Sequence, residues 1–340
     1  MKITILGTAQ SGQQQLFSVL TGLPLDGIQQ KAMEVQLGIC PVKDPRVDRL
    51  VELYKPKKIS YARIEYALLP DFNLQTGPSK EKMMTELKNA DEFCWVARIE
   101  NAESDIRSFL SELIIADMML LEKRLETIEK SQKKKYSEQI EKEKTLLLTC
   151  KKQIEEEKLL QKLPFSEEEQ KALRTYQFLT LKPIILVINL PEDKINTDIG
   201  RFEKEFRLPV IGLSAELEAE ISRLKPEEQE DFMKEMGIAE SALHKMTLKA
   251  YEGLGLISFF TVGEDEVKAW TVRRGSSAPQ AGSVIHSDIE RGFVRAEMFK
   301  YEELLAAGSE AKLKETGKFH LKGRDYIVED GDILSFRFNV

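Results

Sequence analysis

The sequence contains few residues of the kinds that build disulfides and metal sites. In 340 residues it has three cysteines and three histidines. Neither set shows the spacing of metal ligands, and an odd number of distant cysteines is typical of reduced thiols in the cytoplasm. We therefore expect no metal site and no Cys–His nucleophile. The residues concerned are Cys40, Cys94, Cys150, His244, His286 and His320.

The sequence also lacks an apolar run long enough to cross a bilayer, and it opens without a signal peptide. Basic residues do not predominate: 50 Lys and Arg stand against 57 Asp and Glu, a formal net charge of −7. This balance argues against a DNA-binding protein and leaves only local basic patches for RNA. With 42% hydrophobic residues the chain can bury cores in two or three domains. We expect a cytoplasmic protein, monomeric or weakly oligomeric, without a membrane partner.

The N-terminus has the spacing of a phosphate-binding loop. An apolar run at residues 3–6 predicts a buried parallel strand, and Gly7 and Gly12 follow it as G-x-x-x-x-G. In such loops a lysine after the second glycine reaches the phosphates, and the next Ser or Thr binds Mg²⁺. Gln13 and Gln14 hold these two positions here. The spacing fits a plain strand-to-helix turn as well as a phosphate loop that lacks its cation and metal ligand.

Strand and helix patterns alternate along most of the chain. Strands are predicted at 61–69, 92–99, 183–189 and 208–213, with helical segments between them, which indicates an α/β domain with a parallel sheet. The continuous apolar run in the strand at 183–189 is typical of a central strand that is buried on both faces.

Two long segments with helical periodicity interrupt this alternation and predict an antiparallel helical hairpin. Ser104 is the candidate N-cap of the first helix. The tip between the helices is purely basic, which fits a solvated turn and equally a contact with an RNA phosphate backbone. The basic residues of the tip are Lys130, Lys133, Lys134 and Lys135.

From about residue 257 onward, short strands and glycine turns indicate a small α+β domain. Its sequence closely resembles the C-terminal TGS domain of the Obg-like ATPases, the YchF group. Upstream, Asp44-Pro45-Arg46 and the segments 178–183 and 251–254 resemble motifs of the same family. The closest blocks of the C-terminal domain are residues 260–271, 278–281, 285–296 and 323–340.

The resemblance covers essentially the whole chain and implies its domain organisation. A P-loop NTPase-like domain with a mostly parallel sheet would comprise residues 1–103 and 164–256. An antiparallel helical-hairpin arm, a coiled coil, would be inserted at 104–163, and a β-grasp (TGS) domain would occupy 257–340. The resemblance also implies ATP hydrolysis in preference to GTP hydrolysis and association with the ribosome.

The resemblance implies a base-binding site but not an intact phosphate site. The family's N-x-x-E motif matches Asn189 and Glu192, and the loop that closes over the base matches Ser214, Ala215 and Glu216. ATP or GTP bound through these residues without Mg²⁺ is therefore compatible with the sequence, although no cofactor is required by it.

On the phosphate side the chain departs from the family at four places. The loop has Gln13 and Gln14, the switch I threonine position falls near Ala32, and no D-x-x-G follows the strand that ends near residue 69. The nearest carboxylate is Asp71. Phosphoryl transfer depends on positioning and electrostatic stabilisation by these groups, so we expect turnover to be lost while the fold is retained.

Three hypotheses follow. The first is a catalytically impaired Obg-like homologue, without catalytic residues, that acts as a binding module for the ribosome or RNA. The second is a weak ATPase or GTPase with a relocated metal site at Asp71. The third is a structural assembly partner without ribosome contact, which the basic arm tip opposes.

Overall fold

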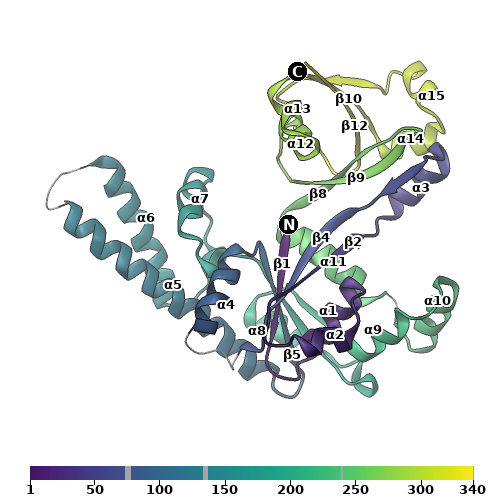
Figure 1. Ribbon diagram of the computed structural model, residues 1–340. Coiled ribbons are helices and arrows are strands. Elements are labelled where there is room, and N and C mark those ends of the chain that lie inside the picture. The colour runs from purple at the N-terminus through teal and green to yellow at the C-terminus, as the bar shows by residue number, and fades with distance from the viewer. Residues whose placement is uncertain (73–77, 133–136, 239, 340) are drawn as a thin grey trace. The chain divides into compact units, whose positions relative to one another are not determined.

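The computed structural model describes residues 1–72, 78–132, 137–238 and 240–339 (Figure 1). Contacts divide the chain into two compact units. The first unit comprises Met1–Gly38 and Glu65–Lys245, and the second comprises Ile39–Ile64 and Met246–Val340. Residues 39–64 thus belong with the C-terminal residues, whereas the sequence placed them in the nucleotide-binding domain. Among the described residues, no helix combines the length and apolar character that crossing a bilayer requires.

A six-stranded sheet forms the centre of the first unit, and its strand order is β2-β4-β1-β5-β6-β7. β1 pairs in parallel with β4 and β5, and β5-β6 and β6-β7 are also parallel. The predicted α/β fold with a mostly parallel sheet is confirmed. The strands are β1 (Lys2–Gly7), β2 (Gln36–Val42), β4 (Ala62–Leu68), β5 (Glu92–Arg98), β6 (Ile184–Asn189) and β7 (Val210–Leu213).

Helices cover both faces of this sheet. On one face, Trp95 of β5 stacks on Phe109 of α5 with ring centroids 4.2 Å apart, inside a large apolar cluster. After α7 ends at Leu173, a 3-10 turn, η3 (Arg174–Tyr176), follows, and the chain then turns at Gln177 with a positive φ of 52°. The helices are α1 (Gln13–Thr21), α2 (Leu25–Gln30), α4 (Pro78–Asn89), α7 (Glu167–Leu173), α8 (Gly200–Phe206), α9 (Ala215–Ile221) and α10 (Pro226–Glu235). A further helix, α11 (Ala242–Gly253), begins in the first unit and continues in the second.

The predicted helical hairpin consists of α5 (Ala102–Gln132) and α6 (Glu138–Glu155) (Figure 1). Buried apolar side chains, including Leu121 and Leu147, join the two helices. Ser104 is not the N-cap, because α5 begins before it and its hydroxyl donates to the carbonyl of Asn101. At the tip, Lys130 is exposed and pairs with Glu126, whereas Lys133, Lys134 and Lys135 lie outside the described residues.

A buried carboxylate fixes the base of the hairpin to the sheet. Asp117 of α5 is 2% exposed and accepts hydrogen bonds from the backbone N–H of Leu179 at 2.9 Å and of Thr180 at 2.8 Å. The Thr180 hydroxyl donates a third bond at 2.7 Å. A carboxylate in such a site needs several donors to offset its desolvation. This tie holds α5 against η4 (Leu179–Leu181), the turn that leads into β6.

The second unit contains a mixed sheet with the order β11-β10-β12-β8-β9-β3. β8 and β9 form an antiparallel hairpin, and β12 pairs in parallel with β8 and antiparallel to β10, which is a β-grasp arrangement. The strands are β3 (Lys58–Ser60), β8 (Leu256–Thr261), β9 (Glu266–Arg273), β10 (Phe293–Lys300), β11 (His320–Lys322) and β12 (Asp332–Phe338). The helices are α3 (Pro45–Tyr54), α12 (Ala278–Ile285), α13 (Ser287–Arg291), α14 (Tyr301–Ala307) and α15 (Glu310–Glu315).

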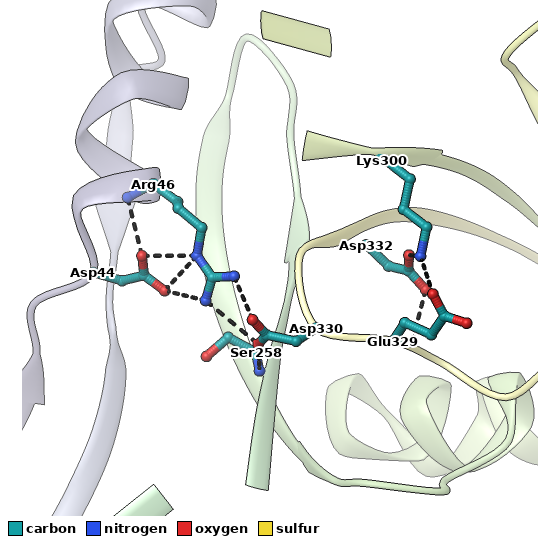
Figure 2. A network of polar contacts seen from close by, with 7 residues as sticks. All are labelled: Asp44, Arg46, Ser258, Lys300, Glu329, Asp330 and Asp332. Atoms are coloured by element: carbon teal, nitrogen blue, oxygen red, sulfur yellow. Dashed lines mark hydrogen bonds and ion pairs between the residues drawn. The ribbon is translucent and has the colours of Figure 1, made fainter. Parts of the chain in front are cut away.

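An ion-pair network explains why residues 39–64 belong to the second unit (Figure 2). The guanidinium of Arg46 donates to Asp44 at 3.0 Å and to Asp330 at 2.6 Å. It also lies over the ring of Phe260, 5.0 Å from its centroid. Asp330 in turn accepts from the backbone N–H of Ser258 at 2.8 Å. The network joins a helix start to a turn 284 residues away, and β3 adds a parallel strand to β9 beside it.

The turn that carries Asp330 is itself held by side chains. Lys300 donates to Asp332 at 2.6 Å and to Glu329 at 2.7 Å, and Asp332 is fully buried (Figure 2). Gly331 has a φ of +84°, a conformation that favours glycine. The sequence Asp330-Gly331-Asp332 is therefore a structural element of the β-grasp sheet.

The first unit also buries a carboxyl group that has no hydrogen-bond partner among the described residues. Glu92 begins β5 and is 0% exposed. Burial raises the pKa of Glu92 to about 9, and the charge of Asp91 adds to the shift. The folded protein therefore keeps a proton on Glu92 at neutral pH, where the unfolded chain releases it.

Glu92 should make stability fall as pH rises. Between about 4.5 and about 9 the folded state binds more protons than the unfolded state, so the free energy of unfolding decreases. At pH 7, Glu92→Gln should be more stable than wild type by on the order of 3 kcal/mol, with little difference near the ordinary glutamate pKa. Urea unfolding of both proteins across this pH range measures the difference in the free energy of unfolding. Glu65→Gln, exposed on β4, is the control, and equal pH slopes for Glu92→Gln and wild type would contradict the assignment.

Candidate functional site

The loop between β1 and α1 has the predicted glycines, and both are required by close contacts. Gly12 has a φ of +96°, and a Cβ there would lie 2.2 Å from Nδ2 of Asn189. A Cβ on Gly7 would lie 2.2 Å from the hydroxyl of Ser11 and 2.8 Å from the carbonyl oxygen of Val96. The loop is therefore packed tightly against the ends of β5 and β6, at the carboxyl edge of the sheet where ligands bind in α/β folds.

The side chain of Gln13 is turned into this loop and is 3% exposed. Its Oε1 accepts a hydrogen bond from the Ser11 hydroxyl at 2.5 Å, and its Nε2 donates to Oδ1 of Asp71 at 2.6 Å. Ser11 is fully buried. At the position where a phosphate loop presents a lysine, this chain has a neutral amide with both ends engaged by the protein. Gln14 follows it, half-buried on α1.

Asp71 lies just beyond the end of β4 and reaches the loop through Gln13. Burial raises the pKa of its carboxyl group, while the hydrogen bond from Gln13 lowers it. Among the residues that the structure describes, no three His, Cys, Asp or Glu side chains come together as a potential metal site. Asp71 thus lies beside the loop, where one of its oxygens accepts a hydrogen bond from the Gln13 amide.

Asn189 connects the loop to two other elements. From the end of β6, its Nδ2 donates to the carbonyl oxygen of Ser11 at 3.0 Å. Its Oδ1 accepts from the backbone N–H of Ala215 at 3.0 Å, at the start of α9. Ser214 caps the same helix by accepting from the N–H of Leu217 at 3.4 Å. The structure therefore brings Gly7, Gly12, Gln13, Asn189, Ser214 and Ala215 together.

Two predicted base-binding residues are not joined to this cluster. Glu192 lies in η5 (Glu192–Lys194) and Glu216 in the first turn of α9, and both are exposed. Neither side chain forms a hydrogen bond within the described part of the chain. Both remain available to a ligand, but nothing in their own contacts fixes their orientation.

Two residues at the loop, Ser11 and Asp105, were not predicted from the sequence. Ser11 lies inside the G-x-x-x-x-G segment, where a hydroxyl could have been noted as a donor. Asp105 of α5 accepts a hydrogen bond from the Thr8 hydroxyl at 2.9 Å. No sequence spacing connects Asp105 to the loop, since the contact exists only because α5 follows β5 at the same edge of the sheet.

The charge around the loop is unfavourable for phosphate. Among the described residues that form side-chain hydrogen bonds with residues 7–14, Asp71 and Asp105 are acidic and none is basic. Phosphate sites instead combine backbone N–H groups with Lys or Arg. The loop can make the turn of a phosphate-binding loop, but the carboxylates of Asp71 and Asp105 beside it disfavour an anion.

Removing the Asn189 side chain should loosen the loop. Asn189→Ala deletes two hydrogen bonds to buried backbone groups, and we expect the free energy of unfolding to fall by about 1–3 kcal/mol. Amide hydrogen exchange at residues 8–14 and 215–217 should become faster. Glu192→Ala, in the same N-x-x-E segment but exposed, is the matched control and should change neither quantity. Unaltered exchange in Asn189→Ala would show that the side chain does not hold the loop.

Comparison with known proteins extends over the full chain. A family model described as "YchF-GTPase_C: Protein of unknown function (DUF933)" matches residues 256–339. The "Ribosome-binding ATPase YchF" of Bacillus subtilis (strain 168) is 35% identical over 363 residues, covering 99% of this chain and 98% of that protein. Its namesake in Escherichia coli O157:H7 is 32% identical over 363 residues, with 100% and 99% coverage.

The three-dimensional structure agrees with this similarity. The solved structure of the Schizosaccharomyces pombe YchF GTPase is 25% identical in sequence and matches with a TM-score of 0.85, covering 99% of this chain and 97% of that one. Sequence identity above 30% along the whole length, together with the same fold, places the protein: this chain belongs to the YchF family.

Proposed function

We propose that this chain is a ribosome- or RNA-associated binding protein that keeps the YchF fold but does not hydrolyse nucleotide. Its relatives are named ribosome-binding ATPases. The observation that carries the loss of hydrolysis is the side chain of Gln13, held between Ser11 and Asp71 in the loop. Ribosome association would place the protein in the cytoplasm.

The energetics of the loop support this proposal. A triphosphate entering it would meet a neutral amide in place of lysine, at a loss of about 1.5–3 kcal/mol for the missing charge-assisted contact. Gln13 would also have to give up its two hydrogen bonds, and Asp71 would repel the anion. Without a Ser or Thr at position 14, the loop also lacks its Mg²⁺ ligand. Stabilisation of the transition state by lysine and metal supplies most of the catalysis in this chemistry.

A second candidate function is weak ATP or GTP hydrolysis with a relocated metal. Asp71 supports it, because its carboxyl group already lies beside the loop, where it accepts a hydrogen bond from Gln13. The exposed Glu192 and Glu216 would then face the base. The two functions differ in whether Mg²⁺ strengthens nucleotide binding.

Restoring the missing groups should restore phosphate binding. Wild type is expected to show no Mg²⁺-dependent ATP turnover, and Gln13→Lys/Gln14→Ser should bind Mg²⁺-ATP at least about tenfold more tightly than wild type. Isothermal titration calorimetry measures the affinity for Mg²⁺-ATP, and a phosphate-release assay measures ATP turnover. Gln15→Lys adds the same charge to α1 outside the loop and should have no effect. Turnover by wild type that disappears in Gln13→Ala would refute the proposal and favour the relocated-metal enzyme.

Ribosome association should depend on the basic arm tip. Replacing Lys130, Lys133, Lys134 and Lys135 by Glu should abolish co-sedimentation with ribosomes, and wild-type co-sedimentation should weaken steeply between about 50 and about 200 mM salt. Lys142→Glu, exposed on α6 and ion-paired with Glu138, is the matched control on the same arm. Co-sedimentation that is insensitive to salt and to the tip would exclude a phosphate contact there. No co-sedimentation at any salt would favour the assembly-partner hypothesis.

A further inference from the structure

A cavity in the first unit, away from the loop, is lined by basic side chains of the kind that the loop lacks. It has a volume of about 530 Å³ and lies where α5, the segment after α6 and the end of α8 meet. It shares no residue with the loop at residues 7–14. Its volume is in the range of sites for small organic ligands.

The floor of this cavity is apolar. Leu159 is 7% exposed, and Leu110, Ile114 and Phe206 are partly buried where they pack against the main core of the first unit. The guanidinium of Arg107 lies 5.5 Å from the centroid of the Phe206 ring. A floor of this kind, with a partly accessible aromatic ring, suits a flat apolar group such as a nucleobase.

The rim carries two cations without a carboxylate partner. Of its basic residues, Arg107 pairs with Glu205 and Lys158 pairs with Glu156. Lys162 and Arg207 form no ion pair with any residue that the structure describes. The Lys162 ammonium donates one hydrogen bond, to the backbone carbonyl of Arg207 at 2.6 Å.

That bond places Lys162 at the C-terminus of α8, where a cation is favourable in its own right. The ammonium group has three donors, so two remain for a ligand, and the Arg207 guanidinium keeps its side-chain donors. Arg207 has a φ of +53°, as the residue that ends α8. The Lys162 ammonium is therefore bonded to the backbone of Arg207, so both residues lie on the same edge of the cavity.

We propose that this cavity binds a nucleotide unit. Lys162 and Arg207 would hold a phosphate group, which guanidinium and ammonium groups recognise through charge-assisted hydrogen bonds. The base would lie on the apolar floor beside Phe206. Glu157, an exposed carboxylate on the rim without an ion pair among the described residues, would accept a hydrogen bond from a base N–H.

The same chemistry could come from a free mononucleotide or from one nucleotide of a single-stranded RNA. Both supply a phosphate attached to a planar base, and the cavity's contacts do not require a triphosphate or a metal. This site is independent of the loop, so nucleotide binding here would survive even if the loop binds none.

The test uses the 340-residue chain and a fluorescent mononucleotide, mant-ADP, in EDTA so that no metal contributes. Saturable binding with a dissociation constant below about 1 mM is expected. Lys162→Glu/Arg207→Glu should weaken it at least about tenfold, whereas Lys204→Glu, exposed on α8 outside the cavity, should not. Competition by a short oligouridylate at lower concentration than by ADP would identify RNA as the source, and the reverse order would identify the free nucleotide.

Photolabelling of wild type with 8-azido-ADP, followed by peptide mapping, locates the site without any variant. Label on residues 153–162 or 205–207 is the expected result. Label on residues 7–16, equal loss of binding in the Lys204→Glu control, or no saturable binding up to about 1 mM would overturn the proposal. The Gln13→Lys/Gln14→Ser variant tests Mg²⁺-ATP binding at the loop, whereas the mant-ADP titration in EDTA tests binding at the cavity. A negative result in one experiment therefore leaves the other proposal open to its own test.

Discussion

The side chain of Gln13 is fixed at both ends of its amide in the loop between β1 and α1. A buried amide needs partners for both its oxygen and its nitrogen, and here Ser11 and Asp71 supply them. Once these bonds are made, the loop is complete without a ligand.

A different kind of constraint holds the second unit together. Arg46 is shared between Asp44 at the start of its own helix and Asp330 in a turn near the C-terminus, and its guanidinium lies over the Phe260 ring. Arginine suits this role better than lysine does, because its guanidinium is planar, always charged and able to bond two carboxylates at once. The Asp-Pro-Arg and Asp-Gly-Asp motifs of the family resemblance are therefore two halves of one structural network.

Charge is distributed very differently over the two candidate ligand sites of the first unit. Among the described residues, the side chains bonded to the loop include Asp71 and Asp105 and no cation. The cavity at the base of the arm instead contains Lys162 and Arg207, which form no ion pair with any described residue. Because an anion is bound through the donors that remain unpaired in the folded protein, the cavity is the better phosphate site even though the loop has the better-known sequence pattern.

The sequence by itself determined the parallel sheet, the helical arm, the family and the missing lysine, since these are expressed as apolar periodicity and as short motifs read in order. It did not determine that residues 39–64 belong with the C-terminal unit, because the Arg46–Asp330 pair joins residues 284 positions apart. Nor did it reveal Asp105 at the loop or the cavity at Phe206. Such contacts depend on which strand ends and helix ends meet, and only the tertiary structure decides that.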